Sequence, residues 1–114
     1  MKNVLIIGST GQIGSELTMK LRAEYAEGNI VAGYIPSAPP TGVLAESGPS
    51  EVVDITNAKQ IAEVVDKYHI DTIYNLAALL SAVAENKPQL AWHIGIDGLM
   101  NVLEVSREKK CAVF

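Results

Sequence analysis

A glycine-rich turn follows a short apolar segment near the N-terminus. Residues 4–7 are apolar, and the next seven, GSTGQIG at 8–14, place glycines at i, i+3 and i+6. A buried strand that turns sharply into a helix directs that helix's free N–H groups at one point, which attracts phosphate. Here Gly8 permits the tight turn, Gly11 lets a pyrophosphate touch the backbone, and Gly14 lets the helix lie close to the strand. The pattern favours dinucleotide binding over a purely structural turn.

The size and composition of the chain limit its class. The 114 residues are 48% apolar and 19% charged, so we expect a single domain over residues 1–114, folded around a hydrophobic core. The formal net charge is −4 and the basic residues form no dense cluster, which argues against a nucleic-acid partner. The chain has no signal-peptide pattern and no apolar run long enough to span a membrane. We therefore expect a cytoplasmic protein with neither a membrane partner nor a metal site.

Apolar patterning predicts strands alternating with helices. The predicted strands are residues 3–7, 30–35, 51–54, 71–76 and a fifth that starts at 112. The predicted helices cover residues 12–27, a segment carrying Ile61, Val64, Val65 and Tyr68, and residues 88–110. Prolines predict a surface loop over residues 36–49. This alternation predicts an α/β fold: a Rossmann-type parallel sheet with helices on both faces and strand order 3-2-1-4-5, truncated at the fifth strand.

Two details of the first two helices can be predicted from side-chain spacing. Ile13, Leu17 and Leu21 are four residues apart, which predicts one apolar face on the first helix. Thr56 precedes the second helix and is a residue type that can cap a helix N-terminus.

The helix predicted over residues 88–110 has two apolar faces. One carries Ala91, Ile94, Val102 and Val105, and the other carries Trp92, Ile96, Leu99 and Leu103. A helix lying on a sheet needs only one apolar face. The second face therefore indicates another buried surface, formed by a further part of the chain or by another subunit. The alternative is that Trp92 merely packs under a loop.

A second informative segment reads DTIYNLAALLSA, residues 71–82, and places small residues at the carboxyl end of a strand. Ligands of open α/β sheets lie beyond the carboxyl ends of the strands. Together with GSTGQIGSEL at 8–17 and GLMNVLEVSREKK at 98–110, this segment resembles the extended short-chain dehydrogenase/reductase (NAD-dependent epimerase/dehydratase) family. The likeness is closest to the L-threonine 3-dehydrogenase branch and covers nearly the whole chain.

The resemblance implies a binding site for NAD, with NADP the less favoured cofactor. The residues that it places against the pyrophosphate are Gly8, Gly11, Gln12, Ile13 and Gly14. It places Asp54 and Ile55 beside the adenine, and Leu76, Ala77 and Ala78 along the ribose and nicotinamide side. Ser81 would lie near the substrate, which is L-threonine in the complete enzyme, and helix 88–110 would form a homodimer. From the residues alone, Asp54 can equally be a turn or capping residue, and Ser81 a solvent-facing hydroxyl.

The chain departs from the family pattern in its catalytic pair. Family members use Tyr-x-x-x-Lys, in which the lysine helps to lower the pKa of the tyrosine. None of the four tyrosines here is followed by a lysine four residues later; those positions hold Asn29, Ala38, Thr72 and Ala78. We therefore expect no catalytic residue in this chain, and no turnover by the chain alone.

Two further departures concern the cofactor side. Tyr34 occupies the position where an acidic residue normally binds the adenosine ribose, and Gly95 replaces an asparagine that is frequent in the family. We interpret the chain as the N-terminal, NAD-binding portion of an L-threonine 3-dehydrogenase-like oxidoreductase that converts threonine to 2-amino-3-oxobutanoate. The alternatives are a non-catalytic nucleotide-binding or dimerising module, and a fragment of a nucleotide-sugar epimerase/dehydratase.

Overall fold

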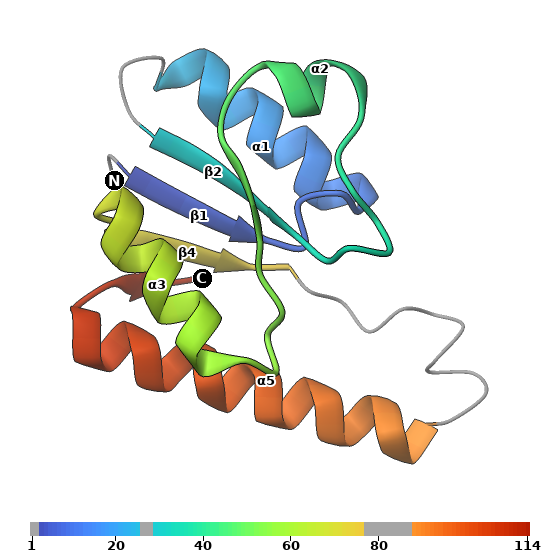
Figure 1. Ribbon diagram of the computed structural model, residues 1–114, viewed down its shortest axis with the longest axis vertical. Coiled ribbons are helices and arrows are strands. Elements are labelled where there is room, and N and C mark those ends of the chain that lie inside the picture. The colour runs from blue at the N-terminus through green and yellow to red at the C-terminus, as the bar shows by residue number, and fades with distance from the viewer. Residues whose placement is uncertain (1–2, 26–28, 77–87) are drawn as a thin grey trace.

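The computed structural model describes residues 3–25, 29–76 and 88–114, with side chains in the last range from Ile96 onward. Its elements in chain order are β1 (Asn3–Ile7), α1 (Gln12–Glu24), β2 (Asn29–Tyr34), α2 (Gly42–Glu46), β3 (Ser50–Val52), α3 (Ala58–Tyr68), β4 (Thr72–Asn75), α5 (Pro88–Lys109) and β5 (Ala112–Val113). The strands form one sheet in the order β3-β2-β1-β4-β5, and every pair is parallel (Figure 1). The predicted fold class and strand order are confirmed.

Helices cover both faces of the sheet. On one face, α1 packs through Leu21 against Val4, Ile6 and Ile30. On the other face, α3 and α5 enclose a larger cluster that includes Leu5, Val31, Ile61, Val64 and Val102. Figure 1 shows α1 and α3 on opposite sides of the strands. Because β1 is buried on both faces from Val4 to Ile7, these four residues are all apolar instead of alternating with polar ones.

Three local predictions need correction. The predicted loop over residues 36–49 contains a short helix, α2, which starts two residues after Pro40. Asn57, not Thr56, caps α3: its Oδ1 accepts from the Gln60 N–H at 3.1 Å. The Thr56 hydroxyl and N–H are already bonded to the Asp54 carboxylate. Ile13, in the first turn of α1, is 71% exposed and does not belong to the packed face that Leu17 and Leu21 form.

From Ile96 onward the long helix α5 has the two faces that its sequence predicts, whereas the side chains of Ala91, Trp92 and Ile94 lie outside the described residues. Val102 and Val105 are buried against the sheet. A second group is exposed by 41–53%, and we call it the α5 stripe: Ile96, Leu99, Met100 and Leu103. In the described ranges, then, this apolar stripe has no covering element. Among the helices that the structure describes, none combines the length and hydropathy needed to cross a bilayer.

Candidate functional site

The glycine turn links β1 to α1 at the carboxyl edge of the sheet. Gly8 has φ +82°, in the left-handed region that glycine adopts without strain. Its carbonyl accepts from the Gly11 N–H at 3.3 Å, which closes the turn. The Ser9 N–H and hydroxyl both donate to the Gly33 carbonyl, at 3.1 and 2.9 Å, and so fix the turn to β2. The turn is thus held by a bond within itself and by two bonds to the backbone of β2.

The other two glycines of the turn have different surroundings. A Cβ on Gly14 would lie 2.2 Å from the Gly8 oxygen and 3.0 Å from the Ser9 Cα. Those neighbours are backbone atoms, so the contact of helix with turn requires glycine at position 14. A Cβ on Gly11 would meet only the Gly8 oxygen, at an ordinary 3.5 Å. Protein packing therefore does not explain why position 11 is a glycine.

The N-terminus of α1 leaves backbone donors available. Gly11 is its N-cap, supplies no side-chain hydrogen bond, and is followed by a first turn without acidic residues. The Gly11 carbonyl accepts from the Ser15 N–H at 2.8 Å, the first bond of the helix. The earlier N–H groups, those of Gln12, Ile13 and Gly14, cannot be satisfied within the helix. Together with the helix dipole they form a site suited to an anion.

Tyr34 is the last residue of β2, beside this turn. Its carbonyl accepts from the Val53 N–H at 2.8 Å, which aligns the ends of β2 and β3. The Tyr34 side chain is half-buried. Two residues that were predicted to lie on the same edge, Asp54 and Ile55, follow directly after this point.

The Asp54 carboxylate is used in its own turn. Its Oδ1 accepts from the Thr56 N–H at 2.9 Å and from the Thr56 hydroxyl at 2.7 Å. The Asp54 N–H donates to the Gln60 Oε1 at 2.7 Å. The turn-forming role that the sequence also allowed is therefore present. Asp54 is nevertheless exposed, so a contact with adenine stays a prediction.

Ile55 belongs to the hydrophobic core. Its side chain is 9% exposed and lies so close to α5 that a Cβ on Gly98 would come within 2.3 Å of its Cδ1. Its carbonyl accepts from the Asn101 side-chain amide at 2.8 Å. Ile55 thus connects the segment after β3 to α5. Its contact with adenine stays a prediction.

The third group of predicted residues is described in part. Leu76 is half-buried, packs with the α1-side cluster, and donates from its N–H to the Ile7 carbonyl at 2.9 Å. It therefore lies at the carboxyl ends of β4 and β1. Ala77, Ala78 and Ser81 lie outside the described residues. In the described ranges, no group of three or more histidine, cysteine, aspartate or glutamate residues is placed to hold a metal ion.

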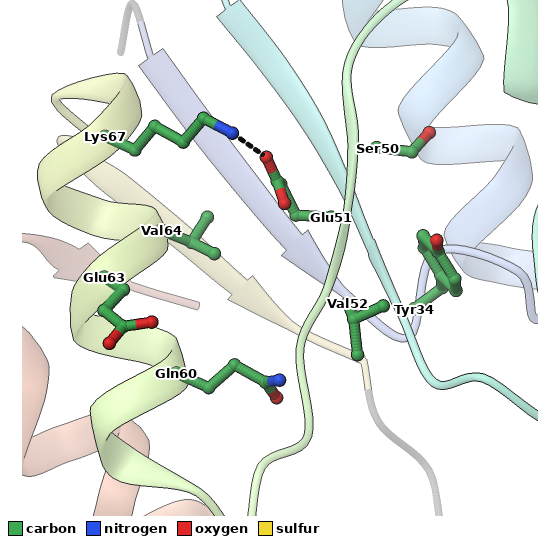
Figure 2. A pocket seen from close by; sticks show the side chains of 8 residues that line it. All are labelled: Tyr34, Ser50, Glu51, Val52, Gln60, Glu63, Val64 and Lys67. Atoms are coloured by element: carbon green, nitrogen blue, oxygen red, sulfur yellow. Dashed lines mark hydrogen bonds and ion pairs between the residues drawn. The ribbon is translucent and has the colours of Figure 1, made fainter.

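A cavity of about 340 Å³ lies along the outer strand β3, and sequence reasoning did not predict it. Its lining, drawn in Figure 2, consists of Tyr34, Ser50, Glu51, Val52, Gln60, Glu63, Val64 and Lys67. Apart from Tyr34, none of these residues belongs to the predicted dinucleotide site. The cavity is formed by β3 and α3, which pack together only in three dimensions, so no sequence motif marks it.

An ion pair crosses this cavity from α3 to β3. The Lys67 Nζ lies 2.6 Å from the Glu51 Oε1 (Figure 2). The same oxygen also accepts from the Tyr68 hydroxyl at 2.8 Å. The hydrogen bond from Lys67 holds the pKa of Glu51 below its usual range, and the same bond raises the pKa of Lys67. Charged groups at the free edge of an outer strand discourage pairing with a strand from another molecule. We interpret the pair as edge protection.

Comparison with curated proteins finds relatives about three times as long as this chain. A protein of Staphylococcus saprophyticus, described as an uncharacterised epimerase/dehydratase, is 43% identical over 114 residues, which are 100% of this chain and 35% of that protein. A similarly described protein of Staphylococcus epidermidis is 40% identical and is covered to 36%. The chain thus spans about a third of the length of these relatives.

Solved structures that match this chain are likewise covered over about a third of their own length. L-threonine dehydrogenase from Clostridium difficile matches with a TM-score of 0.85 and 47% identity, over 100% of this chain and 35% of that one. A GalE-like L-threonine dehydrogenase from Cupriavidus necator matches with a TM-score of 0.85 and 37% identity, over 98% and 35%. A UDP-glucose 4-epimerase structure, at 24% identity and a TM-score of 0.80, shares the fold.

A sequence model of a known family extends over nearly the whole chain. It describes the NAD dependent epimerase/dehydratase family and matches residues 4–114. The matched part includes β1, the glycine turn and all the later elements of the sheet. This chain therefore belongs to the NAD dependent epimerase/dehydratase family.

Proposed function

We propose that the chain binds NAD, with the pyrophosphate seated on the N-terminus of α1. The observation that carries this proposal is the contrast between two glycines of one turn. Gly14 is required by the backbone of the turn itself, whereas Gly11 has room for a Cβ. Gly11 is exposed beside the free N–H groups of α1, and packing within the protein does not require a glycine there. A ligand that approaches the backbone closely would account for it.

The remaining contacts follow the carboxyl edge of the sheet. Under this proposal the dinucleotide extends from the α1 N-terminus toward Asp54 and Ile55 for the adenine. In the opposite direction it extends along Leu76, Ala77 and Ala78 for the nicotinamide half. The exposed Ile13 would cover one side of the pyrophosphate, and Ser81 would lie near the substrate. This direction agrees with the general position of ligands in open α/β sheets.

We further propose that the complete protein is an L-threonine 3-dehydrogenase-like oxidoreductase. The similarity to L-threonine dehydrogenases at 47% and 37% identity supports this substrate. When bound, NAD would accept the hydride from the β-carbon of threonine, and loss of the hydroxyl proton to a base outside these residues would complete the oxidation to 2-amino-3-oxobutanoate. In this scheme the present residues hold and orient the cofactor. No tyrosine of this chain has a lysine four positions later, and we assign no catalytic residue to it.

The substitution Gly11→Ala tests the proposed cofactor site. We expect NAD to bind at least tenfold more weakly, because the new methyl group would occupy the space of the pyrophosphate. Loss of a glycine N-cap and reduced freedom of the unfolded chain act in opposite directions, so the free energy of unfolding should change by less than about 1 kcal/mol. Calorimetric titration with NAD and urea unfolding measure the two effects. Unchanged NAD affinity in a folded variant would contradict the proposal.

A second candidate function is favoured by the α5 stripe. Its four exposed apolar side chains fit a surface that associates with a second copy of the chain, with or without a bound nucleotide. Such an association is the homodimer that the family resemblance implies. It would also be the whole function of a non-catalytic module.

The variant Leu103→Lys tests association through the stripe. We expect the mass from light scattering to fall from that of a dimer to that of a monomer, because the charge would have to be buried in the contact. Glu108→Lys is the matched control: it places the same charge on an exposed site of the same helix and should leave the mass unchanged. A monomer at all concentrations of the unmodified chain would exclude this association.

A further inference from the structure

The end of β2, which in the proposed site would meet the adenosine ribose, carries no charged residue. No Asp, Glu, Lys or Arg occurs from residue 29 to residue 44, the stretch that contains β2 and the segment after it. At this place a dinucleotide site normally has an acid for the ribose 2′-hydroxyl, or an arginine for a 2′-phosphate. Tyr34 holds that position here. Its hydroxyl has no hydrogen-bond partner within the described ranges, so it is available to a ligand.

Two charged side chains near the end of β2, those of Asp54 and Lys67, already have partners within the protein. The Asp54 carboxylate accepts two hydrogen bonds from Thr56 through its Oδ1. In the cavity that Tyr34 lines, Lys67 is paired with Glu51 at 2.6 Å, which leaves Glu63, an exposed side chain, as the remaining charge. No cation on this cavity is therefore free to pair with a 2′-phosphate.

An arginine of α1 that contacts β2 also has its hydrogen-bond donors occupied. The Arg22 guanidinium donates to the carbonyls of Ile30, Leu44 and Pro49. Ile30 lies near the start of β2, whereas Tyr34 is at its end. Arg22 therefore contacts β2 near its start, away from Tyr34. Its N–H groups already donate to protein acceptors.

From these contacts we propose that Tyr34 provides a neutral contact for the adenosine ribose, so that the chain distinguishes NAD from NADP only weakly. The inference rests on the proposed dinucleotide site. An acid at this position forms a charge-assisted hydrogen bond with the 2′-hydroxyl and repels a 2′-phosphate. The Tyr34 hydroxyl donates a neutral hydrogen bond to either group and repels neither. The preference for NAD then comes from the lack of a free cation alone.

Calorimetric titration of the full chain with NAD and with NADP measures the discrimination. We expect the Kd for NADP to exceed that for NAD by less than tenfold. Tyr34→Asp should raise this ratio at least tenfold, because it introduces both the charge-assisted bond and the repulsion. Tyr34→Phe should weaken both cofactors by two- to tenfold and leave their ratio unchanged, since it removes one neutral hydrogen bond.

The matched control is Glu63→Gln, which removes an exposed acid of the cavity that Tyr34 lines without changing the size of the side chain. We expect the NADP-to-NAD ratio of this variant to equal that of the unmodified chain. A ratio above ten in the unmodified chain, or a ratio that falls in Glu63→Gln, would overturn the role of Tyr34 and leave the dinucleotide site in place. Binding of neither cofactor by a folded chain would instead overturn the proposed function, and this inference with it.

Discussion

Gly14→Ala is expected to lower the free energy of unfolding by about 3 kcal/mol, the upper part of the range for overpacked sites. The added methyl group would lie 2.2 Å from the Gly8 oxygen and 3.0 Å from the Gly8 carbon. Relief would require α1 to move away from the turn. That movement would disturb the packing of Leu21 against Val4 and Ile6 on the same face. The alanine also has no flexible neighbour that could yield, because both contacted atoms belong to the backbone.

Urea unfolding followed by far-ultraviolet circular dichroism measures this loss. Gly11→Ala is the matched control, since it adds the same methyl group three residues earlier in the same turn, where the nearest atom is 3.5 Å away. The two variants should therefore separate: Gly14→Ala loses stability and Gly11→Ala loses NAD binding. Equal free energies of unfolding for the two variants would show that α1 does not lie as close to the turn as the distance from Gly14 to Gly8 implies.

The order of elements could be predicted because local patterns agree with the topology. The apolar run of β1, the glycine turn and the spacing of Ile61, Val64 and Val65 each specify one element from neighbouring residues. Right-handed crossovers between parallel strands then leave few arrangements, and the observed order β3-β2-β1-β4-β5 is the common one. The second apolar face of α5 was predictable for the same reason, because helical period alone defines it.

Features that depend on contacts between distant residues could not be predicted. The sequence allowed either a turn or an adenine contact for Asp54, and only the positions of Thr56 and Gln60 show that its turn forms. Ile55 follows the same strand end, yet its burial depends on α5, more than forty residues later. The cavity beside β3 depends likewise on α3 packing across the sheet edge.

Arg22 is the most heavily bonded side chain among those described, although no pattern in the sequence marks it. Its Nε and Nη2 donate to the Ile30 carbonyl at 3.2 and 3.1 Å. Its Nη1 donates to the Leu44 carbonyl at 2.7 Å, and its Nη2 donates to the Pro49 carbonyl at 2.7 Å. Burial lowers the pKa of Arg22 from its very high ordinary value, yet its guanidinium stays charged in the physiological range. One side chain thus joins α1, β2 and the segment that leads to β3.

Arg22→Met is expected to lower the free energy of unfolding by about 3 kcal/mol, because it leaves three partly buried carbonyls without their charged donor. Chemical denaturation measures the change. Arg107→Met is the matched control: this arginine is 78% exposed and pairs only with Glu104 in the described structure, so its loss should cost less than about 0.5 kcal/mol. Equal losses in the two variants would contradict the assigned role of Arg22.

A double-mutant cycle between Gly48 and Arg22 tests whether the hydrogen bonds of Arg22 hold its guanidinium in one position. A Cβ on Gly48 would lie 2.5 Å from the Arg22 Nε. A free arginine could move away from that methyl group at little cost, but three carbonyls hold this one in place. Gly48→Ala should therefore destabilise the unmodified chain by at least about 1 kcal/mol more than it destabilises the Arg22→Met chain. Equal costs in both backgrounds would mean that the guanidinium moves freely, and that the segment before β3 is held by other contacts.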